Sequence, residues 1–158
     1  MPRITDDNNR RLRAGRLATE RLRELNIPYS DVVKNSLVCC GQVRVAVKYS
    51  RLKWEKKYPL YEFYTTPAER QRGSLDAHLV LLIADRGSAV DFYILDASDP
   101  VFYKEDGKLK TIINYVVDAK PYDGTNSLNR WKMAEAKDQW GKIGEILSQL
   151  LMEHLRSA

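Results

Sequence analysis

The feature that most constrains the fold is a near-continuous apolar run over residues 75–84. Its longest uninterrupted stretch, residues 79–84, has the length of a strand and is far short of the roughly 18 apolar residues that a membrane span needs. Because apolar side chains point to both faces of such a strand, we predict that it is a central strand covered on both sides. The chain is therefore expected to fold as a soluble domain with no membrane partner.

Helical spacing at both ends of the chain and strand-like patterns between them complete the predicted fold. An opening helix is predicted over residues 6–25. Its narrow apolar packing face is formed, at three- and four-residue steps, by Leu12, Gly15, Ala18 or Thr19, Leu22 and Leu25. Strands are predicted over residues 37–40, 43–49, 58–65 and 90–95, with a further hairpin in 103–117, a charged loop over 67–74 and a closing helix over 127–155. This order predicts one domain over residues 1–158, of the α+β or mixed α/β class.

Positive charge is concentrated in the first part of the chain. Residues 1–57 hold 14 Lys and Arg residues against 6 Asp and Glu residues, a net charge of +8, whereas residues 58–158 have a net charge of −3. A basic segment on a mildly acidic body favours an anionic partner such as nucleic acid, and a solvated basic surface is the alternative. The side chains expected to contact duplex DNA are Arg10, Arg13, Arg16, Arg51, Lys53, Lys56 and Lys57.

The positions of the cysteines indicate in which cellular compartment the protein resides. Cys39 and Cys40 are adjacent, and neighbouring side chains on a strand point to opposite faces, so we expect no disulfide between them. The two histidines lie too far along the chain to complete a zinc site. Because the N-terminus is polar and charged, it does not resemble a secretory signal. These features predict a cytoplasmic protein.

The segment Val45-Ala46-Val47-Lys48 has the alternation of a strand with one apolar face. Ala46 and Lys48 are two residues apart, so their side chains are predicted to lie on the opposite face, side by side. A carboxylate and a lysine in this arrangement, with a second carboxylate nearby, can hold Mg²⁺ and orient an attacking water. The segment is therefore the candidate site for phosphodiester chemistry.

Several features in chain order resemble the PD-(D/E)XK nuclease superfamily, especially its group I intron homing endonucleases and its Holliday-junction-resolvase-like members. The opening helix carries Gly15-x-x-Ala18 with Glu20 close behind, Asp31 precedes the strand, and Val45-Ala46-Val47-Lys48 resembles the strand motif of the family. An aromatic strand at 61–64 and Asp76 before the apolar run continue the likeness. The resemblance implies a restriction-endonuclease-like core, with a central mixed sheet flanked by the basic N-terminal helix and a long C-terminal helix. It also implies Mg²⁺ as cofactor, Asp31 as metal ligand, Lys48 as the cation that orients water, and Glu20 as a further site residue.

Ala46 departs from the family pattern, because it stands where a Glu, Asp or Gln is expected and cannot ligate a metal. Three explanations are open. The site is degenerate and only DNA binding remains, the ligands have moved to Glu62, Asp76 or Glu20, or Ala46 is an introduced change of Glu or Gln. The leading hypothesis is a Mg²⁺-dependent endonuclease, or its inactivated form, that acts on duplex DNA as a dimer or higher oligomer. The alternatives are a catalytically dead nuclease-fold module that binds nucleic acid, and a basic protein-interaction domain.

Overall fold

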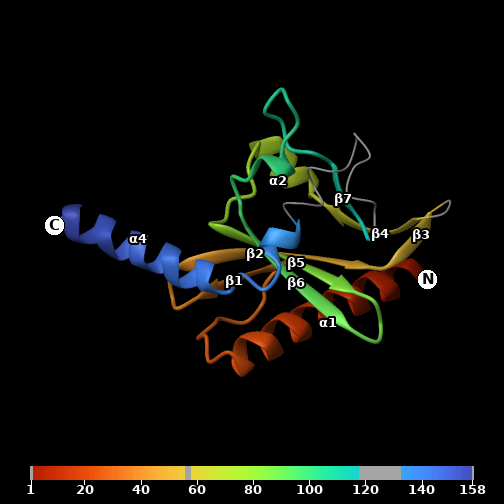
Figure 1. The fold of residues 1–158 in the computed structure, drawn as a ribbon, viewed down its shortest axis with the longest axis horizontal. Helices are drawn as coiled ribbons and strands as arrows, with labels where there is room; N and C mark the ends of the chain where they lie inside the picture. The colour runs from red at the N-terminus through yellow and green to blue at the C-terminus, as the bar shows by residue number, and fades with distance from the viewer. Residues whose placement is uncertain (1, 56–57, 118–132, 158) are drawn as a thin grey trace.

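The computed structural model describes residues 2–55, 58–117 and 133–157 (Figure 1). An opening helix and a closing helix flank two small sheets, whose strands alternate along the chain. The elements are α1 (Pro2–Glu24), β1 (Ser36–Cys39), β2 (Val43–Arg51), β3 (Lys53–Glu55), β4 (Tyr58–Tyr64), α2 (Pro67–Arg72), β5 (Leu79–Asp85), β6 (Val90–Asp96), a 3₁₀ turn (Pro100–Phe102), β7 (Ile112–Val116) and α4 (Gly141–Ser157). No helix in these ranges is both long and apolar enough to cross a membrane.

The larger sheet has the strand order β1-β2-β5-β6 and is mixed. β1 and β2 form an antiparallel hairpin, β2 and β5 run parallel, and β5 and β6 are antiparallel. Every residue of β5 is buried, which confirms the central strand predicted from the apolar run. This long-range parallel pairing places the Lys48 segment of β2 at the centre of the fold, beside β5.

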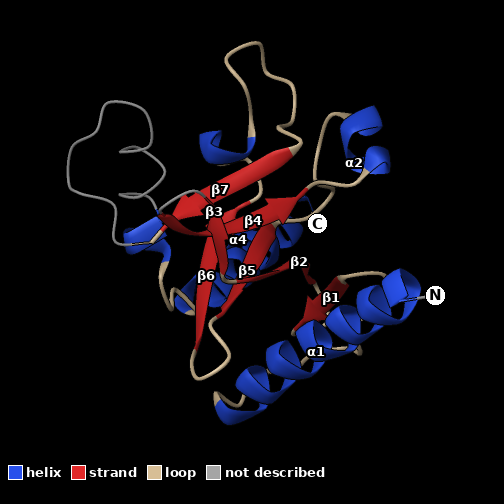
Figure 2. Ribbon diagram, turned by 90° about the vertical axis from the view of Figure 1, so that its right-hand side faces the viewer, coloured by secondary structure: helices blue, strands red, loops and turns tan. Residues whose placement is uncertain are grey.

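Two separate cores cover the two faces of this sheet. In Figure 2, α1 lies on one side of the sheet and β4 and β7 lie on the other. On one face, Val45 and Val47 of β2 pack with residues of α1 and with Ile143 of α4. On the other face, Ala46 packs with Tyr61 and Phe63 of the second sheet, whose order is β3-β4-β7. The alternation predicted for β2 is therefore confirmed, and Ala46 lies between the two sheets.

The packing face of α1 agrees with the predicted one at Ala18 and Leu22 and differs from it at both ends. Leu12 and Leu25 are 70% and 41% exposed, whereas Ala14, Ala18 and Leu22 are buried against the sheet. Leu12 precedes Ala14 by two residues, which on a helix places it on roughly the opposite side. Because the sheet meets a face of small residues spaced four apart, the helix lies close to it, and Leu12 faces away.

Two other segments also differ from prediction. Residues 67–74, predicted as a loop, contain helix α2, which Thr66 caps at its start and Gly73 ends in a left-handed conformation. The predicted closing helix over 127–155 is interrupted after a short helical turn at 133–136, and α4 begins only at Gly141. The break arises because residues 137–138 pair with the edge strand β6, through a bridge from Lys137 to Tyr93 and a hydrogen bond from the Asp138 N–H to the Phe92 carbonyl. Residues 127–132 lie outside the described residues.

Candidate nucleic-acid interface

Lys48 is held by a buried ion pair. Its ammonium donates to Glu69 Oε1 at 2.5 Å, and the side chains of Lys48 and Glu69 are only 10% and 9% exposed. Lys48 lies on β2, with Ala46 on the same face, as predicted. The carboxylate beside it is that of Glu69, and not that of Asp31.

Glu69 is placed by the start of helix α2. The Thr66 hydroxyl accepts from the Glu69 N–H at 3.1 Å, and the Thr66 N–H donates to Glu69 Oε1 at 2.8 Å, so the two residues form a capping box. Both Lys48 and the Thr66 N–H therefore bind the same carboxylate oxygen. Thr66-Pro67-Ala68-Glu69 has the sequence of a helix start, with a hydroxyl residue, a proline at the first helical position and a glutamate three residues after the cap. That signal could have located Glu69 from the sequence.

The described residues around Lys48 do not fit a Mg²⁺ ion. Ala46 is 6% exposed, offers no oxygen and packs in the core between the sheets. Glu69 is already bound by Lys48 and by the cap of α2. Across residues 2–55, 58–117 and 133–157, no three His, Cys, Asp or Glu side chains are grouped so that they could hold a metal ion.

The other carboxylates considered from the sequence lie elsewhere. Asp31 is exposed in the loop after α1, and Glu20 is exposed on α1 itself. Glu62 accepts from Lys53 at 3.1 Å and from the Tyr64 hydroxyl at 2.6 Å. Asp76 pairs with Arg44 at 3.0 Å on the surface. Glu62 and Asp76 are thus bound by other side chains, and the carboxylate that contacts Lys48 is that of Glu69.

Two adjoining cavities run along α1, and we call them together the basic groove. The smaller, of about 360 Å³, reaches Lys48, and the larger, of about 450 Å³, reaches Asp31; Arg11 and Asn35 line both. Basic side chains along the groove are Arg10, Arg11, Arg16, Lys34 and Lys48, and Asp31 is its one lining carboxylate among the described residues. The fold thus brings the predicted residues Arg10, Arg16, Asp31 and Lys48 to one surface.

Of the remaining residues predicted to contact DNA, those that the structure describes do not line the basic groove. Arg13 donates through Nε to Asp85 at 2.6 Å, so its guanidinium has a partner within the protein. Lys53 pairs with Glu62 on the second sheet, and Arg51 is exposed at the end of β2. Lys56 and Lys57 lie outside the described residues. Arg11 and Lys34 were not singled out from the sequence, because only the fold shows that they line the same groove.

Asp85 joins α1 to the sheet behind the groove. Its carboxylate accepts from Arg13, from the Tyr49 hydroxyl at 2.5 Å and from the Gly87 N–H at 2.8 Å. Burial alone would raise the pKa of Asp85, but the hydrogen bonds from Arg13, Tyr49 and Gly87 outweigh it and lower the pKa to about 2. Because Tyr49 also lines the smaller cavity, this cluster fixes one wall of the groove.

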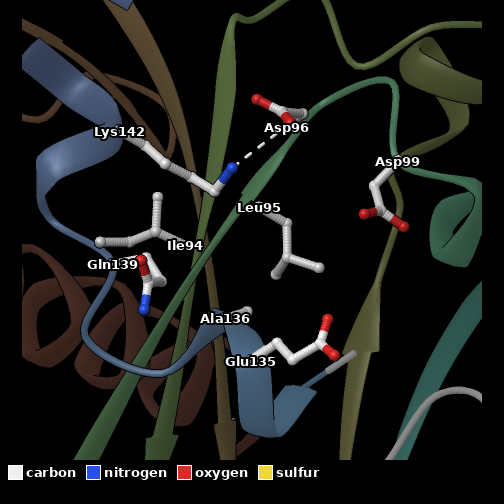
Figure 3. Close-up of a pocket in the computed structure, with 8 residues that line it drawn as sticks. All are labelled: Ile94, Leu95, Asp96, Asp99, Glu135, Ala136, Gln139 and Lys142. Atoms are coloured by element: carbon white, nitrogen blue, oxygen red, sulfur yellow. Dashed lines mark hydrogen bonds and ion pairs between the residues drawn. The ribbon is translucent and has the colours of Figure 1, made fainter. Parts of the chain in front are cut away.

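A cavity at the far edge of the larger sheet has the opposite character. Asp96, Asp99 and Glu135 line this cavity of about 270 Å³, and the Lys142 ammonium lies 3.5 Å from Asp96. Figure 3 shows these side chains. The Asp99 side chain also caps the 3₁₀ turn by accepting from the Val101 N–H. An acidic cavity of this kind repels phosphate, so an anionic partner is favoured at the basic groove and not here.

The comparisons with known proteins concern the fold. No known protein family and no curated protein matches the sequence. Among solved structures, the chain is similar to a bacterial homing endonuclease, I-Ssp6803I, with a TM-score of 0.55 over 92% of this chain and 93% of that one. The chain has a homing-endonuclease-like fold. The two sequences are 18% identical, so the likeness concerns fold alone. It confirms the predicted mixed sheet with flanking helices, while membership of the PD-(D/E)XK superfamily stays a prediction.

Proposed function

We propose that this protein binds duplex DNA through the basic groove. The observation that carries the proposal is the excess of cations there: besides Lys48, which is paired with Glu69, four Lys and Arg side chains and one carboxylate line the two adjoining cavities. Arginine and lysine side chains bind the phosphate backbone, and release of counterions from DNA supplies much of the affinity. The fold similar to that of a homing endonuclease also supports DNA as the partner.

The protein is expected to bind DNA at this site without hydrolysing it. Ala46 offers no ligand, Lys48 is bound to Glu69, and no three His, Cys, Asp or Glu side chains of the described residues are grouped to hold a metal ion, which favours binding over Mg²⁺-dependent hydrolysis. We expect plasmid DNA incubated with the protein and Mg²⁺ to stay uncut. Cleavage in Mg²⁺ that stops in EDTA would contradict this assignment and support the Mg²⁺-dependent endonuclease. The expected dimer or higher oligomer stays a prediction, to be checked by sedimentation analysis.

DNA affinity is expected to depend steeply on salt. If Arg10, Arg11, Arg16 and Lys34 each neutralise one phosphate, log affinity should fall against log salt with a slope of about −4, from roughly 0.9 per contact. The double variant Arg11→Ala/Arg16→Ala should flatten this slope to about −2, because two contacts are lost. Fluorescence anisotropy with one duplex at several salt concentrations measures both slopes.

A matched control removes two charges elsewhere. Lys104 and Lys108 are exposed on the loop that projects on the opposite side of the molecule from α1 (Figure 1). Lys104→Ala/Lys108→Ala changes the net charge as much as the groove variant does, so we expect it to leave the slope near −4. Equal slopes for the two double variants would refute the groove as the binding site, and an affinity independent of salt would refute DNA binding by phosphate contacts.

A further inference from the structure

Tyr64 is an exposed aromatic residue in the lining of the smaller cavity of the basic groove. The residue is 48% exposed and lines this cavity together with Arg10 and Arg11. Its hydroxyl donates to Glu62 at 2.6 Å, and the Lys53 ammonium lies 5.6 Å from the ring centroid. These two contacts orient the ring, so Tyr64 presents an exposed aromatic surface beside cationic side chains. Binding of phosphate groups alone does not require an aromatic surface.

Asn35 adds a hydrogen-bonding side chain at the same cavity. Its backbone is in the left-handed region, with φ of 63°, and its carbonyl accepts from the Val47 N–H at 2.8 Å, so β2 holds it in place. The residue lines both cavities of the groove, and its carboxamide makes no hydrogen bond to any residue that the structure describes. A carboxamide presents one donor and one acceptor side by side, the pattern that matches the N6 and N7 edge of adenine.

We infer that the smaller cavity receives a single unpaired base, with adenine favoured, from DNA bound in the groove. This inference rests on the proposed function and names its preferred substrate class. Tyr64 stacks on the face of the base, Asn35 bonds its edge, and Arg10 and Arg11 bind the adjacent phosphates. A base inside a duplex is stacked on both faces and has no free face for Tyr64, so the cavity selects DNA in which a base is unpaired.

The test compares two probes that differ by one nucleotide. One probe is a fully paired duplex, and the other is the same duplex with a single bulged adenine; affinities are measured at one salt concentration. We expect tighter binding of the bulged probe, on the order of tenfold, which is typical for stacking of one base on an aromatic side chain. Tyr64→Ala should abolish the preference, and Tyr64→Phe, which retains the ring, should keep most of it. Thermal unfolding of each variant checks that the fold is intact.

A second variant tests the edge contact separately. Asn35→Gly fits the left-handed backbone at this position and removes only the carboxamide. Probes with bulged adenine, guanine, cytosine or thymine should then be bound alike, whereas the unchanged protein favours adenine. Equal binding of paired and bulged probes with a steep salt slope would overturn this inference and leave the proposed function standing. Salt-independent or undetectable binding of both probes would overturn the proposed function itself.

Discussion

Lys48→Met is expected to lower the free energy of unfolding by about 3 kcal/mol, because it leaves the Glu69 carboxylate buried without its cation. The methionine retains most of the volume of the lysine stem, so the loss reports the broken ion pair and not an empty space. Glu69 keeps only the Thr66 N–H at Oε1, which does not replace a cation for a side chain that is 9% exposed. Urea-induced unfolding at neutral pH measures the change.

The same measurement on two further variants separates the ion pair from other effects. Adding Glu69→Gln to Lys48→Met should restore about 2 kcal/mol, because the neutral amide still accepts from Thr66 and no buried charge is left. Asp76→Asn removes a carboxylate from the exposed pair with Arg44, whose side chains are 51% and 61% exposed. This control should cost less than about 1 kcal/mol. If Lys48→Met cost as little as Asp76→Asn, the pair would not be a buried anchor between β2 and α2.

The parts of the fold that could be predicted from the sequence are those written in a local pattern. The apolar run predicted β5 as a buried central strand, and the alternation of Val45 and Val47 with Ala46 predicted which faces of β2 meet which core. Both patterns depend only on the two-residue period of a strand, so they can be identified without knowing which strands or helices pack against it. For the same reason Lys48 was correctly placed beside Ala46.

The packing face of α1 shows where a local pattern is ambiguous. Helical spacing places Ala18 and Leu22 in line with Leu12 and Leu25, and it therefore predicted all four on one packing face. The sheet packs against Ala18 and Leu22 but continues to Ala14, while Leu12 and Leu25 are left exposed. Which residues at the ends of the face are covered depends on the shape of the sheet surface, and the helix sequence alone does not contain that information.

The candidate site was only partly predictable because its contacts are long-range. Arg10, Arg16, Asp31 and Lys48 were singled out, and the fold gathers them in the basic groove. Glu69 was missed because its capping box was interpreted as part of a loop. The partner of Arg13, Asp85, is 72 residues away in the sequence, and no local signal indicates such a pair.

Acid is expected to destabilise the protein through Asp85. The folded protein holds the pKa of this carboxyl at about 2, below its ordinary value of 3.8, so the folded state favours the charged form. A lowered pKa contributes stability above the unfolded value, and that stability is lost as the pH falls through the folded value. The difference corresponds to about 2 kcal/mol, present above about pH 4 and lost towards pH 2. The side chain is 3% exposed, so solvent screens these contacts little.

Asp85→Asn tests whether Asp85 causes the loss of stability in acid, because the substitution removes the titrating group while keeping nearly the same shape. At neutral pH the variant should lose about 3 kcal/mol of unfolding free energy, since Arg13 loses its buried counter-ion and Tyr49 loses a charged acceptor. As the pH falls from about 4 to 2, the gap between the two proteins should narrow by about 2 kcal/mol, because the unchanged protein then loses the same charge by protonation. Urea unfolding at intervals over this pH range measures the gap.

A gap that stayed constant would mean that Asp85 is not the group whose protonation weakens the link between α1 and the sheet. Because that link also holds Tyr49 in the wall of the groove, loss of DNA affinity should accompany the loss of stability in Asp85→Asn.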